Sequence, residues 1–198
     1  MTLNNKSKDN IIKETVKLIQ KKGYAGTSIQ EIIKKSKAPK GSMYYYFPAG
    51  KDAMILAGVE QINQEFQKKF KNSILPLNNL SDILNALITM FNSKIRIYGT
   101  PSFRMTLLAL ETIGEAPEVA RKCCDVLTDW KKITTRAIIS LGINEKASIN
   151  ICDWFFTTLQ GAISASVIYD DITFMNITNQ SIKLIKNLSK EELESMFI

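Results

Sequence analysis

The chain has 198 residues, of which 45% are hydrophobic and 23% carry a charge, and these proportions exclude a largely disordered protein. No apolar run is long enough to span a bilayer, and the polar amino terminus contains no secretory signal, so we expect a cytoplasmic protein without a membrane partner. Residues 1–51 hold eleven lysines against three carboxylates, a net charge of +8, whereas the remaining residues sum to −1. This distribution is typical of a nucleic-acid-binding segment, although a lysine-rich solvated surface gives a similar pattern.

The residue types that most enzymes use are missing or scattered. The chain contains no histidine, which is the usual general base and a common metal ligand. Cys123, Cys124 and Cys152 lack the C-x-x-C spacing of a zinc or redox site and are expected to be buried thiols. Neither a nucleophile elbow nor a phosphate-binding glycine motif occurs. We therefore expect no catalytic residues, no metal and no cofactor, and catalysis by carboxylates alone stays open as the enzymatic alternative.

The first predicted helix runs from about residue 7 to residue 22. Ile12, Val16 and Ile19 recur at helical spacing, while lysines occupy the other faces. Gly23 follows at the position where a glycine commonly ends a helix.

A second helix is predicted to begin at Thr27 or Ser28. Thr27 with Gln30, and Ser28 with Glu31, both have the three-residue spacing of a capping box, so the two starts stay open. Three isoleucines then form one apolar face, and the pattern is interrupted after Ser36. These features predict a short helix that ends a few residues before the next one begins.

A third helix is predicted to start at Pro39, because a proline in the first turn loses no hydrogen bond. Two helices separated by three or four residues have the geometry of a helix-turn-helix. Met43 and Phe47 are four residues apart and should share the inward face. The other positions carry a lysine, a glycine, a serine and three tyrosines, which suit phosphate oxygens and base edges in a major groove. The alternative is that the tyrosines form a packed aromatic face.

The segment GYAGTSIQEIIKKSKAPKGSMYYYFPAGKDAM resembles the DNA-binding segment of the TetR family of transcriptional regulators. Within it, APKGSMYYYFPAGK is more particularly similar to the LmrA/YxaF-like branch. The family usually has glycine where this chain has Lys37, which predicts a left-handed backbone at that lysine. The resemblance implies DNA contacts from the cap, the third helix and the lysine that opens the fourth helix: Thr27, Lys40, Gly41, Ser42, Tyr44, Tyr45, Tyr46 and Lys51.

The helix-turn-helix segment, residues 1–51, is called the head below. Six further helices are predicted after it, with no strand pattern between them. They cover roughly residues 51–75, 81–98, 102–114, 117–141, 144–169 and 172–188, and a short capped tail follows. The fold class is therefore all-α with about nine helices. We expect a helix-turn-helix DNA-binding domain over residues 1–51 and a ligand-binding and dimerisation domain over residues 52–198, whose LALE segment at residues 108–111 is also similar to the LmrA/YxaF-like branch.

Large apolar side chains in the body could line a mainly hydrophobic pocket. Methionines adapt to varied ligands and aromatic faces bind cations, so the expected effector is a small hydrophobic or cationic molecule. The alternative is that these side chains are plain core. The candidates are Met90, Phe91, Phe103, Met105, Trp154, Phe155 and Phe156.

The family resemblance implies a homodimer formed by the eighth and ninth helices as a four-helix bundle. Small residues there permit close approach and branched ones supply apolar area; the candidates are Gly161, Ala162, Ile163, Ala165, Val167, Ile182 and Ile185. A two-fold dimer presents two recognition helices and should bind a near-palindromic double-stranded operator.

These observations predict a sequence-specific DNA-binding transcriptional regulator, and a repressor that a small ligand releases from its operator. Two alternatives stay open: a DNA-binding protein controlled by a protein partner or by no ligand, and a carboxylate-based enzyme.

Overall fold

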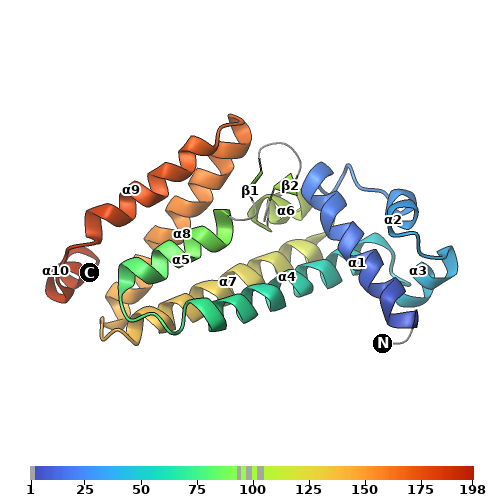
Figure 1. Ribbon diagram of the computed structural model, residues 1–198. Coiled ribbons are helices and arrows are strands. Elements are labelled where there is room, and N and C mark those ends of the chain that lie inside the picture. The colour runs from blue at the N-terminus through green and yellow to red at the C-terminus, as the bar shows by residue number, and fades with distance from the viewer. Residues whose placement is uncertain (1–2, 93–94, 97–99, 102–104) are drawn as a thin grey trace. The chain divides into compact units, whose positions relative to one another are not determined.

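The computed structural model describes residues 3–92, 95–96, 100–101 and 105–198 (Figure 1). Within these ranges it contains ten α-helices, one 3₁₀ turn and one pairing of two-residue strands. The predicted all-α class with about nine helices is confirmed, and the tenth helix is the tail that was predicted as a short capped segment.

The helices and the 3₁₀ turn follow one another in chain order. Their bounds are α1 (Leu3–Lys22), α2 (Ile29–Ser36), α3 (Lys40–Tyr46), α4 (Lys51–Ser73), α5 (Leu80–Asn92), α6 (Met105–Thr112), α7 (Pro117–Ile139), α8 (Glu145–Ile168), η1 (Ile172–Phe174), α9 (Met175–Ile185) and α10 (Lys190–Met196). The strands are β1 (Ile95–Arg96) and β2 (Thr100–Pro101). The predicted fifth helix extended to residue 98, whereas α5 ends at Asn92 and residues 95 and 96 form the strand β1.

Two compact units make up the chain. The first comprises Met1–Glu65 and Gly99–Leu127, and the second comprises Phe66–Tyr98 and Thr128–Ile198. Helices α4 and α7 contribute residues to both units. The predicted division of labour between residues 1–51 and 52–198 concerns function rather than packing and stays a prediction.

Helix ends follow the chemistry that the sequence offers. Asn144 caps α8 by accepting a hydrogen bond from the Ala147 N–H at 2.8 Å, and Ser189 with Glu192 forms a complete capping box at α10. Pro117 is the first residue of α7, as its missing N–H allows. These local signals explain why most helix starts could be predicted.

One hydrophobic cluster of the first unit lies among α1, α2, α3 and the start of α4. Its buried members are Ile11, Ile12, Leu18, Ile32, Ala38, Met43, Phe47 and Met54. Burying one Ile, Leu, Met or Phe side chain contributes about 1.5 to 3 kcal/mol. This cluster therefore fixes α3 on the rest of the head.

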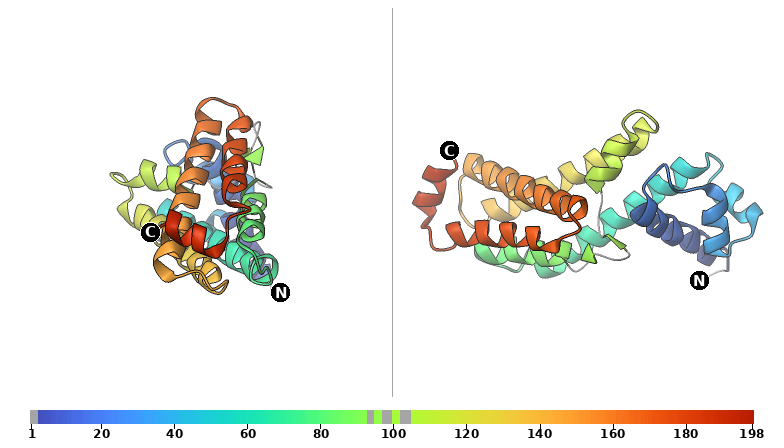
Figure 2. Two further views of the ribbon diagram at one scale, coloured as in Figure 1. Left: turned by 90° about the vertical axis from the view of Figure 1, so that its left-hand side faces the viewer. Right: turned by 90° about the horizontal axis from the view of Figure 1, so that it is seen from above.

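The core of the second unit is rich in aromatic rings. Phe66 stacks on Trp130 with ring centroids 3.9 Å apart, and Phe91 meets Phe156 edge to face at 6.4 Å. Helices α8 and α9 lie side by side in this unit (Figures 1 and 2). Helix α9 also packs on α5, so its inward face belongs to the same core.

Candidate nucleic-acid interface

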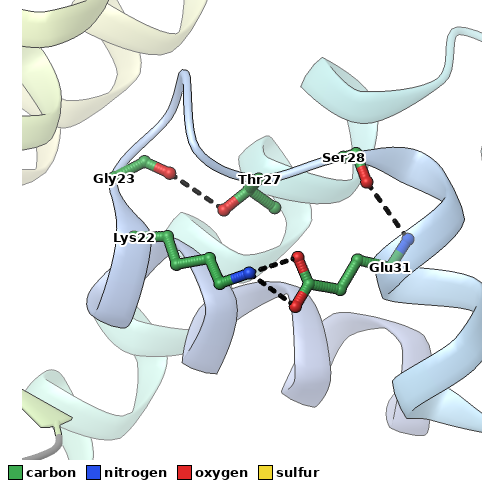
Figure 3. Close-up of polar contacts among 5 residues, drawn as sticks. All are labelled: Lys22, Gly23, Thr27, Ser28 and Glu31. Atoms are coloured by element: carbon green, nitrogen blue, oxygen red, sulfur yellow. Dashed lines mark hydrogen bonds and ion pairs between the residues drawn. The ribbon is translucent and has the colours of Figure 1, made fainter.

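The start of α2 is set by Ser28 (Figure 3). Its hydroxyl accepts a hydrogen bond from the Glu31 N–H at 3.2 Å, so Ser28 is the N-cap. Thr27 instead donates its hydroxyl to the Gly23 carbonyl at 2.9 Å and is 2% exposed. Of the two starts that the sequence left open, the structure selects Ser28, and Thr27 becomes a buried brace of the α1–α2 loop.

An ion pair joins the end of α1 to the start of α2. The Lys22 ammonium lies 2.7 and 2.8 Å from the two carboxylate oxygens of Glu31 (Figure 3). The hydrogen bond from Lys22 lowers the pKa of the Glu31 carboxyl. Because the pair is exposed to solvent, its effect is to orient the two helix ends rather than to stabilise the fold strongly.

The turn between α2 and α3 has the predicted left-handed residue. Lys37 has φ 54° and ψ 21°, which confirms the expectation drawn from the absence of glycine. This conformation costs a residue with a side chain about 1 to 2 kcal/mol. The Ser36 hydroxyl supports the turn by donating to the Ile33 carbonyl at 3.2 Å and accepting from the Ala38 N–H at 3.4 Å.

Helix α3 is short and is anchored by its buried face. Pro39 occupies the N-cap position, one residue before the predicted place in the first turn, and its carbonyl accepts from the Ser42 and Met43 N–H groups at 2.9 and 3.3 Å. No side chain caps the helix. Seven residues form a marginal helix in isolation, so the inward pair does the holding. Met43 is 0% and Phe47 4% exposed, as predicted.

The outward face of α3 carries the polar and aromatic groups. Tyr44 and Tyr45 are 51% and 74% exposed, and Lys40 and Gly41 are also exposed. A Cβ on Gly41 would meet nothing within 4 Å, so the backbone there is open to a partner. Hydroxyls on stiff stems, a cation and accessible backbone together suit a DNA groove.

The remaining two predicted residues of α3 are less accessible. Tyr46 is partly buried against the head core, and its ring meets that of Tyr45 edge to face at 5.0 Å. Ser42 is half-buried. Of the two interpretations of the tyrosines, the packed aromatic face applies to Tyr46, whereas Tyr44 and Tyr45 lie on the surface.

Lys51 opens α4 and is turned toward the α1–α2 loop. Its ammonium donates to the Tyr24 carbonyl at 3.1 Å and lies 3.6 Å from the centroid of the Tyr24 ring. The Tyr24 hydroxyl donates to Asp52 at 2.8 Å, and its backbone N–H donates to Glu111 at 2.7 Å. Burial, followed by the hydrogen bond to Asp52, raises the pKa of Tyr24 to about 12.

Tyr24 is a residue that sequence reasoning did not single out as central. The glycine-aromatic pair at residues 23 and 24 was visible, but its partners could not be read from it. Those partners come from α4 and α6, far along the chain.

The predicted pocket residues fall into both units. Phe91, Phe155 and Phe156 are buried in the second unit, and Met90 is half-buried there. Trp154 is half-buried and meets the ring of Phe197 at 5.6 Å. Met105 is buried in the first unit, where it lines an apolar pocket formed by α1, α4 and α6. Phe103 lies outside the described residues.

The predicted dimer residues also divide. Gly161 is exposed, and a Cβ added there would meet nothing within 4 Å. Ile163 and Ala165 are half-buried, whereas Ala162 is buried. Ile182 and Ile185 are 2% and 3% exposed, because they face the chain's own core. The side chain of Val167 lies outside the described part.

Exposed apolar residues that the sequence analysis did not choose lie on the same two helices. Ile168, Ile177 and Leu184 are 75%, 49% and 76% exposed. The signal that could have found them is their helical spacing on α9, where positions 177 and 184 lie two turns apart.

The cysteine prediction needs one correction. Cys123 and Cys152 are buried, and burial raises their pKa values to about 12 and about 11. Cys124 is exposed, because adjacent residues on a helix point in different directions and only one of the pair can face the core.

No cluster of three or more histidine, cysteine or acidic side chains among the described residues is arranged to hold a metal ion. None of the helices in the described ranges combines the length and apolar character that crossing a bilayer requires.

A helix-turn-helix whose second helix turns polar and aromatic groups outward, within an all-helical chain, defines a DNA-binding protein of the helix-turn-helix class. Residues 11–57 match the family model of the bacterial regulatory proteins of the tetR family. Residues 76–181 match the C-terminal domain of the LmrA/YxaF-like transcriptional regulators. The chain belongs to this LmrA/YxaF-like group of the TetR family, and it is a DNA-binding transcriptional regulator, not an enzyme.

Individual relatives are similar to this chain over most of their length. The HTH-type transcriptional regulator LmrA of Bacillus subtilis is 27% identical over 165 residues, 81% of this chain and 86% of the relative. The uncharacterized regulator YxaF of the same species is 25% identical over 93% of this chain and 97% of its own. A TetR-family regulator from Agrobacterium tumefaciens has the same fold, with a TM-score of 0.80 at 19% identity over 91% of this chain and 97% of that one.

Proposed function

We propose that this regulator is a repressor that binds a near-palindromic operator as a homodimer and is released from it by a small molecule. The observation that carries the DNA-binding part is the division of α3, which buries Met43 and exposes Lys40, Gly41, Tyr44 and Tyr45. The exposed groups reach phosphates and base edges while the buried ones keep the helix in place. Operator binding also requires the protein to act in the cytoplasm, where the DNA is.

The dimer contact that we propose is the outer face of α8 and α9. Gly161 leaves room for a second helix, and Ile168, Ile177 and Leu184 supply exposed apolar area. A contact of this kind repeats itself about a two-fold axis. Two copies of α3 would then read half-sites separated by about one helical turn of DNA, roughly 34 to 36 Å, or by a multiple of it.

The effector that we propose is hydrophobic or cationic and enters the aromatic core of the second unit. Phe66, Phe91, Trp130 and Phe156 offer ring faces and edges in one cluster. Such surfaces bind apolar rings and organic cations. A ligand that binds better to one placement of α4, which belongs to both units, would shift the population of DNA-binding states.

One observation favours a second candidate, a regulator without a small-molecule effector. The stack of Phe66 on Trp130, at 3.9 Å between centroids, already satisfies the faces that a ligand would use. A ligand would have to separate these rings, so a partner protein or constitutive binding is the alternative input.

The first experiment measures binding of the purified protein to the DNA upstream of its own gene by mobility shift. The titration is repeated over a salt series and against a scrambled competitor. Preference for the native sequence that persists as salt rises, with a steep loss of affinity on a log-log plot, supports an operator held by several phosphate contacts. Equal affinity for both DNAs at every salt concentration contradicts operator binding at that site.

Two variants then test the α3 surface. Lys40→Ala and Tyr45→Ala should weaken operator binding by about 1 to 3 kcal/mol each while the far-ultraviolet circular dichroism stays native. Lys69→Ala, at an exposed position of α4, is the control for the charge, and Leu75→Ala, 56% exposed, is the control for an exposed large side chain. A control that loses as much affinity as its partner argues against α3 as the reading element.

The effector proposal is tested through the emission of Trp130. The chain has two tryptophans, so Trp154→Phe leaves Trp130 as the sole indole. Titration with tetraphenylphosphonium, a hydrophobic cation, should change this emission and release operator DNA over the same concentration range. A cation that binds without affecting the DNA, or no change in emission with this probe and with neutral aromatic compounds, favours the second candidate.

A further inference from the structure

A carboxylate from outside the helix-turn-helix holds the loop between α1 and α2. Glu111, in α6, accepts a hydrogen bond from the Tyr24 N–H at 2.7 Å across a separation of 87 residues. A Cβ on Gly23 would lie 2.8 Å from both oxygens of this carboxylate, so the carboxylate rests directly on the Gly23 backbone. Glycine therefore suits position 23 for two reasons: its φ is 72°, and a side chain would collide with Glu111.

Tyr24 connects this contact to the helices that face DNA. Its carbonyl accepts from the Lys51 ammonium at 3.1 Å and from the Thr27 N–H at 3.2 Å. Its hydroxyl donates to Asp52 at 2.8 Å. Thr27 directly precedes Ser28, the N-cap of α2. The start of α2 is thus tied through Tyr24 to the first turn of α4 and to the last turn of α6.

We propose that Glu111 is a positioning residue for operator binding. A hydrogen bond to a charged acceptor is stronger than one to water, so it reduces the freedom of a surface loop that solvent alone would leave mobile. The loop sets where α2 begins, and α2 and the Lys37 turn set where α3 lies. This role goes beyond the helix-turn-helix itself, because the matched tetR segment ends at residue 57 and does not include α6.

The contact should affect specific binding more than general attraction to DNA. Attraction to phosphates depends mainly on charge, whereas sequence reading needs the helix in one register against the bases. A loosened loop keeps the charge of the head and loses the register. A residue that only stabilised the fold would reduce both kinds of binding together.

Three variants of the full chain test the proposal. E111A removes the acceptor, E111Q keeps a carbonyl oxygen at the same reach, and E118A removes an equal charge from the first turn of α7. For each variant we would measure affinity for operator and for scrambled DNA at equal salt, the thermal midpoint, and hydrogen exchange of the Tyr24 amide by nuclear magnetic resonance.

The expected result is that E111A exchanges the Tyr24 amide about tenfold faster and binds operator about fivefold more weakly, while its affinity for scrambled DNA equals that of E118A. E111Q should recover most of both losses. Unchanged exchange at Tyr24, operator binding no weaker than that of E118A, or equal losses on the two DNAs would each overturn the role of Glu111. A wild-type protein without operator preference would instead overturn the proposed function, and the operator role with it.

Discussion

The N–H, carbonyl and hydroxyl groups of Tyr24 all form hydrogen bonds. The ionisation of its hydroxyl therefore reports on the stability of the head. Burial and Asp52 raise its pKa from 10.0 to about 12, so the folded state favours the protonated hydroxyl. The stabilisation is complete below about pH 10 and is lost as the pH rises to about 12. Tyr24→Phe should lower the unfolding free energy by about 1 kcal/mol at neutral pH. Urea titrations of both proteins between these pH values should show the difference shrinking, and a constant difference would contradict the assignment.

Lys37 stores strain in the turn that separates α2 from α3. Its φ of 54° suits glycine, so Lys37→Gly should raise the unfolding free energy by up to about 1 kcal/mol after the greater freedom of the unfolded chain is subtracted. Lys34→Gly, inside α2, loses the same charge and should cost about 1 kcal/mol. Urea unfolding of the two variants measures the contrast, and similar losses in both would show that the turn is not strained.

At this scale the sequence was informative where a resemblance or a local rule applied. Lys37 could be predicted to be left-handed because the family that the segment resembles usually has glycine at this position. The choice between Thr27 and Ser28 could not be made, because both side chains meet the local requirements and only the position of Gly23 decides. The pairing of Tyr24 with Glu111 depends on tertiary packing and leaves no local signal.

Helix α3 offers a test in which stability and DNA binding separate by face. Met43→Ala should cost about 2 to 5 kcal/mol of unfolding free energy because it leaves a cavity in a fully buried site. Tyr45→Ala should change the unfolding free energy by less than about 0.5 kcal/mol, because this side chain is 74% exposed. Urea unfolding gives both values, and a large loss for Tyr45→Ala would place that ring in the core.

Among the elements, helix positions could be predicted better than helix faces. Caps, Pro117 and the apolar periodicity located nearly all of the helices. In α9, however, apolar residues occur on two faces, and hydrophobicity alone does not tell which face meets α5 and α8. The sequence analysis therefore chose Ile182 and Ile185 for a partner subunit, although both are buried within the chain.

For the whole molecule, the proposed dimer makes operator binding depend on a surface of α9, which lies far along the chain from the helix-turn-helix. Leu184→Asp places a charge on the outer face of α9, where the native side chain is 76% exposed, and should produce folded monomers. These monomers should bind operator much more weakly, since each contacts one half-site. Sedimentation and mobility shift would measure both effects. Leu75→Asp, also at an exposed leucine, should leave the dimer intact, and a dimeric Leu184→Asp protein would exclude this face.

The concentration of charge in residues 1–51 was the whole-molecule property that could be predicted directly. It needs no knowledge of packing, because net charge is a sum over residues. The arrangement of the aromatic core was harder to predict. The sequence analysis chose Phe91 and Phe156 as pocket residues but not their neighbours Phe66 and Trp130. A pattern of apolar residues shows that a core exists and does not show which rings touch.

The short, uncapped α3 has a consequence for how the protein responds to warming. Seven residues held mainly by Met43 and Phe47 should open locally at a smaller free energy than the molecule needs to unfold. Heat would then release the operator while the other helices are still intact. In an ordinary melting experiment such a protein would look native at temperatures at which it no longer binds its operator.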